Sequence, residues 1–136
     1  MKKTKSGMST DYMQKDILLV KFPFTDFQGF KKRPVIVISN DEYNSKTLDL
    51  VVCAITSNLS YKDYSVLISN DDLDDGYLIK ESLIKTSHIA TISKRIVIKK
   101  IASLNDEKFK EVKENLRLLF KLSGADDKYT SQEGDN

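Results

Sequence analysis

A short basic run consists of Lys31, Lys32 and Arg33, and it is followed by Pro34 and an apolar stretch. A guanidinium offers a planar pair of donors that fits a phosphate, and it keeps its charge at working pH. Because the run lies where a polar segment enters an apolar one, Arg33 would be held in a defined place. The run predicts a phosphate contact at Arg33, with both lysines beside it. The structural alternative is a solvated basic hairpin end.

A second group of polar residues, Thr56, Ser57 and Asn58, comes directly after the apolar run 48–56. Hydroxyl and amide side chains donate hydrogen bonds to phosphate oxygens and can read the edges of nucleic-acid bases. The alternative is ordinary turn chemistry, since these residue types end strands by bonding the local backbone.

One histidine and several aromatic residues could also contact a ligand. His88 could transfer a proton or stack on a base, although a lone histidine is more often structural. Phe24, Phe27, Phe30 and Tyr61 lie among lysines. Aromatic rings interleaved with cations suit single-stranded nucleic acid, whose bases stack on such rings. For Phe24, packing into the core is an equal alternative.

The composition excludes several classes of protein. The chain has 136 residues, of which 40% are hydrophobic and 31% charged, as in one soluble globular domain. A single cysteine, Cys53, excludes an internal disulfide and a thiolate zinc site, and it is expected to be buried. The sequence contains no P-loop, nucleophile elbow or dinucleotide fingerprint. We therefore expect neither a metal ion nor a cofactor.

The elements that would position these residues are short strands. Runs rich in β-branched residues predict about six strands at hairpin spacing: residues 16–24, 34–39, 48–56, 64–69, 82–92 and 96–101. Residues 25–32 are predicted to form a long hairpin loop, Asn40 and Asp41 a turn, and residues 70–76 an irregular segment.

One amphipathic helix is predicted at the end of the domain. Apolar residues recur there at helical spacing: Phe109, Val112, Leu116, Leu119 and Phe120. Asn105 is the expected N-cap, and Gly124 the expected stop. The order of elements predicts a mainly β fold, a small antiparallel barrel covered by this helix.

The two ends of the chain differ from its middle. Residues 1–14 are polar and predict a flexible arm, residues 15–122 a single domain, and residues 123–136 a disordered acidic tail. No secretory signal follows the basic N-terminus, and no apolar run approaches the ~20 residues of a membrane span. We expect a cytoplasmic protein without a membrane partner.

Taken together, these segments resemble the MazF/PemK family of toxin endoribonucleases from type II toxin–antitoxin systems. The resemblance is carried by DILLVKFPF (16–24), KRPVIVISNDEYN (32–44), DLVVCAITSN (49–58), GYLIKESLIKTSHIATI (76–92) and KKIASLNDE (99–107). It departs from the family pattern at Lys15, where glycine is usual, and at Ala90, where arginine is common. These departures leave the base preference open.

The resemblance implies an SH3-like barrel that works as a homodimer and cuts single-stranded RNA at short sequences. It implies a metal-independent reaction that leaves a 2′,3′-cyclic phosphate and a 5′-hydroxyl, and neutralisation by a cognate antitoxin protein. Arg33 and Thr56 match the family's catalytic pair. The positions that match the RNA groove are Phe24, Ser82 and His88, and His88 is also a candidate general base.

Two other functions remain open from the sequence. Related toxins on the same barrel inhibit gyrase, and a fold does not determine function. Arg33 beside Thr56 argues against such a protein-binding poison, which needs no group to stabilise phosphate charge. The other alternative is a catalytically silent module that binds RNA and regulates.

Overall fold

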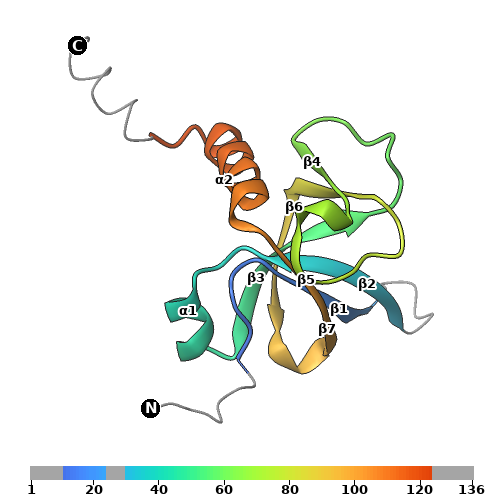
Figure 1. Ribbon diagram of the computed structural model, residues 1–136. Helices are drawn as coiled ribbons and strands as arrows, with labels where there is room; N and C mark the ends of the chain where they lie inside the picture. Colours follow the sequence, from blue (N-terminus) through green and yellow to red (C-terminus); the bar gives the residue numbers. More distant parts are fainter. Residues whose placement is uncertain (1–10, 24–29, 124–136) are drawn as a thin grey trace.

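The computed structural model describes residues 11–23 and 30–123. Within these ranges seven strands form one antiparallel sheet in the order β4-β6-β3-β2-β1-β7-β5 (Figure 1). The strands are β1 (Asp16–Pro23), β2 (Phe30–Val37), β3 (Asp49–Thr56), β4 (Ser65–Ile68), β5 (Leu73–Gly76), β6 (Ser82–Ser93) and β7 (Val97–Leu104). The helices are α1 (Asp41–Lys46) and α2 (Asp106–Phe120), with 3-10 turns η1 (Asn70–Asp72) and η2 (Lys94–Ile96). The predicted class, mainly β with a C-terminal helix, is confirmed.

The sheet curls like a barrel, but its hydrogen-bonded ladder is open. In the described ranges β4 and β5 form the two edges of the sheet. Register shifts interrupt the pairing of β1 with β7 and of β3 with β6. Such bulges bend a strand and increase its twist, so they help the sheet wrap around its own core.

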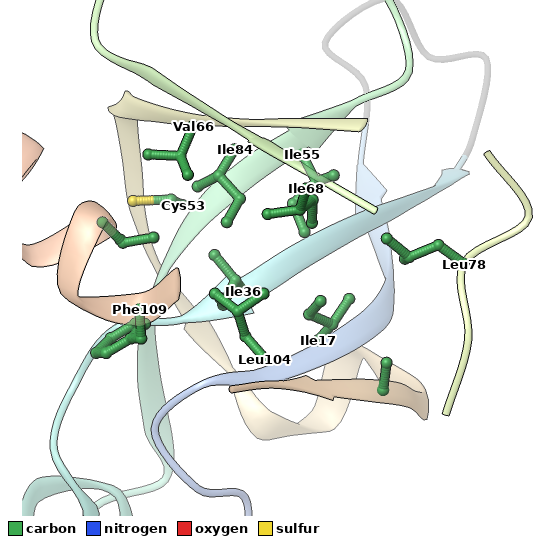
Figure 2. Close-up of a cluster of buried hydrophobic side chains, with 12 residues drawn as sticks. Ile17, Ile36, Cys53, Ile55, Val66, Ile68, Leu78, Ile84, Leu104 and Phe109 are labelled. Atoms are coloured by element: carbon green, nitrogen blue, oxygen red, sulfur yellow. The ribbon is translucent and has the colours of Figure 1, made fainter. Parts of the chain in front are cut away.

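The strands bury apolar residues on two faces, because successive side chains of a strand point in opposite directions. On the helix-side face, Ile17, Ile36 and Cys53 belong to a cluster that includes Phe109 and Val112 of α2 (Figure 2). The second face carries the other cluster: Leu18, Val20, Val35, Val37, Leu50, Val52 and Ile92. Each fully buried aliphatic side chain contributes roughly 1.5–3 kcal/mol relative to an exposed one.

Helix α2 begins where the sequence predicts and ends earlier. The Asn105 side-chain oxygen accepts a hydrogen bond from the Lys108 N–H at 2.7 Å, which confirms the N-cap. The helix ends at Phe120, because Lys121 adopts a left-handed backbone (φ 56°, ψ 43°) and its N–H donates to carbonyls of the last turn. The predicted stop at Gly124 is therefore wrong; Gly124 itself lies outside the described residues.

Three elements differ from the prediction. Helix α1 replaces the predicted turn, and its N-cap Asn40 accepts a hydrogen bond from the Tyr43 N–H at 2.8 Å. Strand β2 begins at Phe30, inside the predicted loop 25–32. Strand β5 forms in the segment expected to be irregular, because it pairs with β7.

Gln14, two residues before β1, contacts α1 and the residue that follows β2. The Gln14 N–H donates to Asp41 Oδ1, and its side-chain amide donates to the Ile38 carbonyl, both at 2.8 Å. Most of the predicted arm and tail lie outside the described residues. In the described part of the chain, no helix is long and apolar enough to cross a membrane.

Candidate active site

Arg33 and Thr56 lie near the ends of neighbouring strands. Strands β2 and β3 are antiparallel, and their pairing ends with Val35 opposite Ala54. Two residues further along each strand, beyond the last pair, come Arg33 in β2 and Thr56 in β3. Val20 of the second cluster pairs with Arg33 from the other side, in β1. Because alternate residues of a strand project to the same face, Arg33 shares the face of Val35, and Thr56 shares that of Val52, which is the second face in both cases.

Arg33 is exposed, and Thr56 is half-buried. Within the described residues, no carboxylate lies within ion-pairing distance of Arg33, and none of the side-chain hydrogen bonds involves it. A guanidinium has five N–H donors in a fixed planar arrangement. Since no described residue uses the guanidinium N–H donors of Arg33, these donors are available to a ligand.

The Thr56 hydroxyl is positioned by the turn that follows β3. Its oxygen accepts a hydrogen bond from the Asn58 N–H at 3.1 Å. Asn58 Oδ1 in turn accepts from the N–H and the hydroxyl of Ser60, at 3.1 and 2.7 Å. A hydroxyl that accepts through its oxygen keeps its own hydrogen for donation. The Thr56 hydroxyl can thus donate a hydrogen bond to an anion beside Arg33. The side-chain Oδ1 of Asn58, in contrast, already accepts two hydrogen bonds from Ser60.

The basic run is divided between the two faces. Lys31 pairs with Phe22 and lies on the second face with Arg33. Lys32 pairs with Lys21, so it projects to the helix-side face. Both Lys31 and Lys32 are exposed, and β2 extends through them. Only Lys31 is brought to the side of Arg33.

His88 forms a small cluster with the loop that follows Thr56. The Tyr61 hydroxyl lies 3.1 Å from His88 Nε2, and the two rings meet edge-on with centroids 5.4 Å apart. Ser87 Oγ lies 3.3 Å from His88 Nδ1. The ammonium of Lys85 sits 4.7 Å from the centre of the Tyr61 ring. Both ring nitrogens of His88 therefore already face a hydroxyl.

Ser57 and Ser82 lie elsewhere. They line a cavity of about 330 Å³ together with Leu19, Pro34 and Ile101. The Ser82 hydroxyl donates to the Lys80 carbonyl at 3.1 Å, and Ser82 precedes Leu83, the cross-strand neighbour of Thr56. By alternation Ser82 points away from the face of Thr56. The structure therefore does not bring Ser57 and Ser82 together with Arg33.

Two residues of this surface were not among the sequence candidates. Phe22 and Lys85 lie on the second face. The alternation of Phe22 with Val20 was the available signal. Phe24 lies outside the described residues. Among residues 11–23 and 30–123, no three His, Cys, Asp or Glu side chains gather as metal ligands would.

Several solved structures of proteins from Mycobacterial species and Deinococcus radiodurans are similar to this fold. An endoribonuclease from a Mycobacterial species superposes with a TM-score of 0.67 at 13% identity, over 82% of this chain and 93% of the other. A Mycobacterial endoribonuclease in complex with its cognate antitoxin gives 0.67 at 14% identity, over 83% and 98%. A MazE–MazF structure from Deinococcus radiodurans gives 0.68 at 18% identity, over 82% and 98%. At these identities the comparison establishes the fold.

The family is established by the sequence itself. Residues 13–120 match the model of the family described as PemK-like, MazF-like toxin of type II toxin–antitoxin system. The match begins at the lead-in to β1 and ends with the last residue of α2, so it spans the whole sheet and the helix that covers it. The chain belongs to the PemK-like, MazF-like toxin family of type II toxin–antitoxin systems.

Proposed function

We propose that this toxin is a metal-independent endoribonuclease that cuts single-stranded RNA at short sequences, with Arg33 and Thr56 as catalytic residues. Membership of the toxin family supports the proposal, and so do the endoribonucleases that share its fold. The observation that carries it is that the neighbouring strands β2 and β3 present the Arg33 guanidinium and the Thr56 hydroxyl on the same face, and that no described carboxylate pairs with Arg33.

RNA supplies its own nucleophile, the 2′-hydroxyl, so the protein needs no serine or cysteine for attack. The 2′-oxygen forms a bond to the adjacent phosphorus and loses its proton to water. The bond from phosphorus to the 5′-oxygen breaks, and that oxygen takes up a proton from water. The products are a 2′,3′-cyclic phosphate and a 5′-hydroxyl, and no metal-activated water takes part.

The protein's contribution is electrostatic. Negative charge grows on the non-bridging phosphate oxygens as the fifth bond to phosphorus forms. The Arg33 guanidinium can bind these oxygens through two N–H donors, and the Thr56 hydroxyl can donate a third hydrogen bond. Lys31, on the same face, attracts the RNA backbone without reading its sequence.

The cognate antitoxin is the proposed protein partner. Two of the similar structures are toxins bound to an antitoxin, one from a Mycobacterial species and one described as MazE–MazF. We infer that a disordered segment of this chain's own antitoxin folds along the second face and blocks Arg33. The toxin itself is proposed to act as a homodimer.

The test is cleavage of single-stranded RNA in the presence of EDTA, comparing wild type with Arg33→Ala. Removing one preorganised donor from a developing oxyanion typically slows catalysis by about 10²–10³-fold. Arg95→Ala is the matched control, since Arg95 is also exposed but lies in η2, beyond the opposite end of β3. We expect the control to cleave at the wild-type rate.

The products decide between the alternatives. Fragments whose 5′ ends accept phosphate from a kinase without prior dephosphorylation carry the 5′-hydroxyl that the mechanism requires. Cleavage that stops with EDTA would contradict metal independence. Salt-sensitive RNA binding without any product would identify a silent RNA-binding module instead.

A further inference from the structure

A second cavity opens on the face that carries Arg33 and Thr56. Its volume is about 230 Å³, and its lining includes Phe22, Val35, Ala54, His88 and Ala90. The walls are apolar except for His88. Alanines at two of these positions leave space that a larger side chain would fill. Its size is below the roughly 300–1,000 Å³ of sites for drug-sized ligands, so it suits a single small ring system.

The cavity adjoins the proposed scissile site along both strands. Val35 is two residues after Arg33 in β2, and Ala54 is two residues before Thr56 in β3. Two residues of a strand span about 7 Å. This distance between the cavity and the proposed scissile site is about twice the ~3.4 Å that separates stacked nucleotides of one strand. A stacked neighbour of the scissile nucleotide would therefore not reach the cavity. A nucleotide whose base is unstacked and turned aside can cover that interval, as bases do in single-stranded RNA bound by proteins.

Charges on the same face favour a nucleic acid as the occupant. Lys31 pairs with Phe22 of the cavity wall, and Arg33 lies between Lys31 and Val35 along β2. Two cations thus border an apolar recess, which is the arrangement that binds a phosphate backbone and receives a base. In the described residues, neither Lys31 nor Arg33 is neutralised by a carboxylate.

His88 is held at the rim with its nitrogens occupied. Tyr61 and Ser87 place hydroxyl oxygens 3.1 and 3.3 Å from its two ring nitrogens. The imidazole edges are therefore engaged within the protein, while a ring face is the part left to contact a ligand. An aromatic face stacks on any base without reading its hydrogen-bonding edge.

We propose that this cavity receives one nucleobase, from the nucleotide next to the scissile phosphodiester, and selects it by size and stacking. The inference rests on the proposed function and adds the determinant of its specificity. Because the walls offer few hydrogen-bond partners, the cavity separates purines from pyrimidines rather than the members of either class. The His88 ring forms one wall of the cavity, and the small side chains of Ala54 and Ala90 determine the volume that is open to a base.

The experiment compares wild type with Ala90→Leu, which fills the cavity, and with His88→Ala, which removes a wall. Cut sites are sequenced from a random pool of RNA. Both variants should lose the preference at one position flanking the cut, by about tenfold or more, while other positions keep theirs. Thr91→Leu is the matched control: Thr91 is exposed, and as the next residue of β6 it points to the other face.

A second arm makes the outcome independent of cleavage. The same proteins select sequences from a random pool of 2′-O-methyl RNA, which lacks the nucleophile. If wild type cuts no RNA but the bound pool shows a preference that Ala90→Leu removes, the proposed reaction fails and the base pocket stands. Unchanged preferences in both variants would overturn the pocket. So would an Ala90→Leu protein that only loses antitoxin binding or self-association, since the cavity would then receive a protein side chain.

Discussion

The Thr56 hydroxyl has two possible tasks, and its hydrogen bonds separate them. Its oxygen accepts from the Asn58 N–H, which helps to order the turn after β3. Its hydrogen is directed to none of the described acceptors, so it can serve a ligand on the side of Arg33. The first task is structural, and the second is needed only when RNA is bound.

Thr56→Val keeps the shape of the side chain and removes the hydroxyl, whereas Thr56→Ser keeps the hydroxyl. A hydrogen bond to a charged group contributes about 1.5–3 kcal/mol, so we expect Thr56→Val to slow RNA cleavage by about 10- to 100-fold. Thr56→Ser should retain most activity. Single-turnover cleavage measures the rate, and thermal unfolding measures the structural share. Equal losses in both variants, or a loss explained by reduced stability alone, would show that the hydroxyl only orders the turn.

The basic run shows where sequence reasoning about single residues stops. The sequence predicts that Lys31 and Lys32 lie in one loop, because residues 25–32 include Gly29 and several polar residues. Strand β2 begins at Phe30, so the two lysines alternate between faces and only Lys31 joins Arg33. The residue types identify the cations, but the side of the sheet on which each one lies depends on where the strand begins.

Strand β5 depends on a glycine whose environment the sequence does not reveal. Gly76 has a positive φ of 78°, which L residues with a side chain rarely adopt. A Cβ at this position would lie 2.1 Å from the Ile101 carbonyl oxygen and 2.6 Å from the Ala102 Cα, both in β7. The short strand therefore pairs with β7 only because residue 76 has no side chain.

Gly76→Ala should lower the free energy of unfolding by about 1–3 kcal/mol or more, because strain at such a backbone position adds to the contact with β7. Asp75→Ala is the control: it removes an exposed pair with Lys100 (3.6 Å), worth about 0–1 kcal/mol. Urea unfolding compares the two, and hydrogen exchange at Ala102 locates the damage. A Gly76→Ala protein that unfolds at the wild-type urea concentration would contradict the expectation.

Local pattern predicted most elements, and long-range pairing decided the rest. Strands 16–24, 48–56 and 82–92 are apolar and β-branched enough to be recognised alone, and Asn105 marks the start of α2 by its own chemistry. Strand β5, in contrast, consists of LDDG and has no strand pattern of its own. The sequence does not predict the end of α2, because Lys121 adopts the left-handed conformation that is expected of a glycine.

Across the whole molecule, the two faces of the sheet divide the predicted site. Arg33, Thr56 and His88 border the second face, whereas Ser57 and Ser82 line the cavity on the helix side. The family resemblance placed Arg33, Thr56, Ser82 and His88 at one RNA groove, because a match of sequence positions carries no information about the bulges of this chain. The register shift between Cys53 and Ala54 in β3 interrupts the pairing with β6, and such shifts decide which side chains meet.

The single cysteine belongs to β3 and to the helix-side cluster, which also contains Phe109 of α2 (Figure 2). Cys53 is fully buried, and its thiol donates weakly to the Thr86 carbonyl at 3.8 Å. Burial disfavours the thiolate and raises the pKa of Cys53 from 9.0 to about 12. Above pH 9 the unfolded chain ionises this thiol while the folded chain does not. Its contribution to stability is therefore complete below pH 9 and falls as the pH rises towards 12.

The reactivity of the Cys53 thiol should accordingly show whether the hydrophobic core opens. At pH 8 the folded toxin should react with iodoacetamide at least a hundredfold more slowly than the chain unfolded in urea, because the thiolate is the reacting species. The reaction is followed by mass spectrometry. The stability margin of wild type over Cys53→Ala, measured by urea unfolding at several pH values, should shrink between pH 9 and 12. Rapid labelling of the folded toxin at pH 8 would mean that β3 and α2 separate without global unfolding.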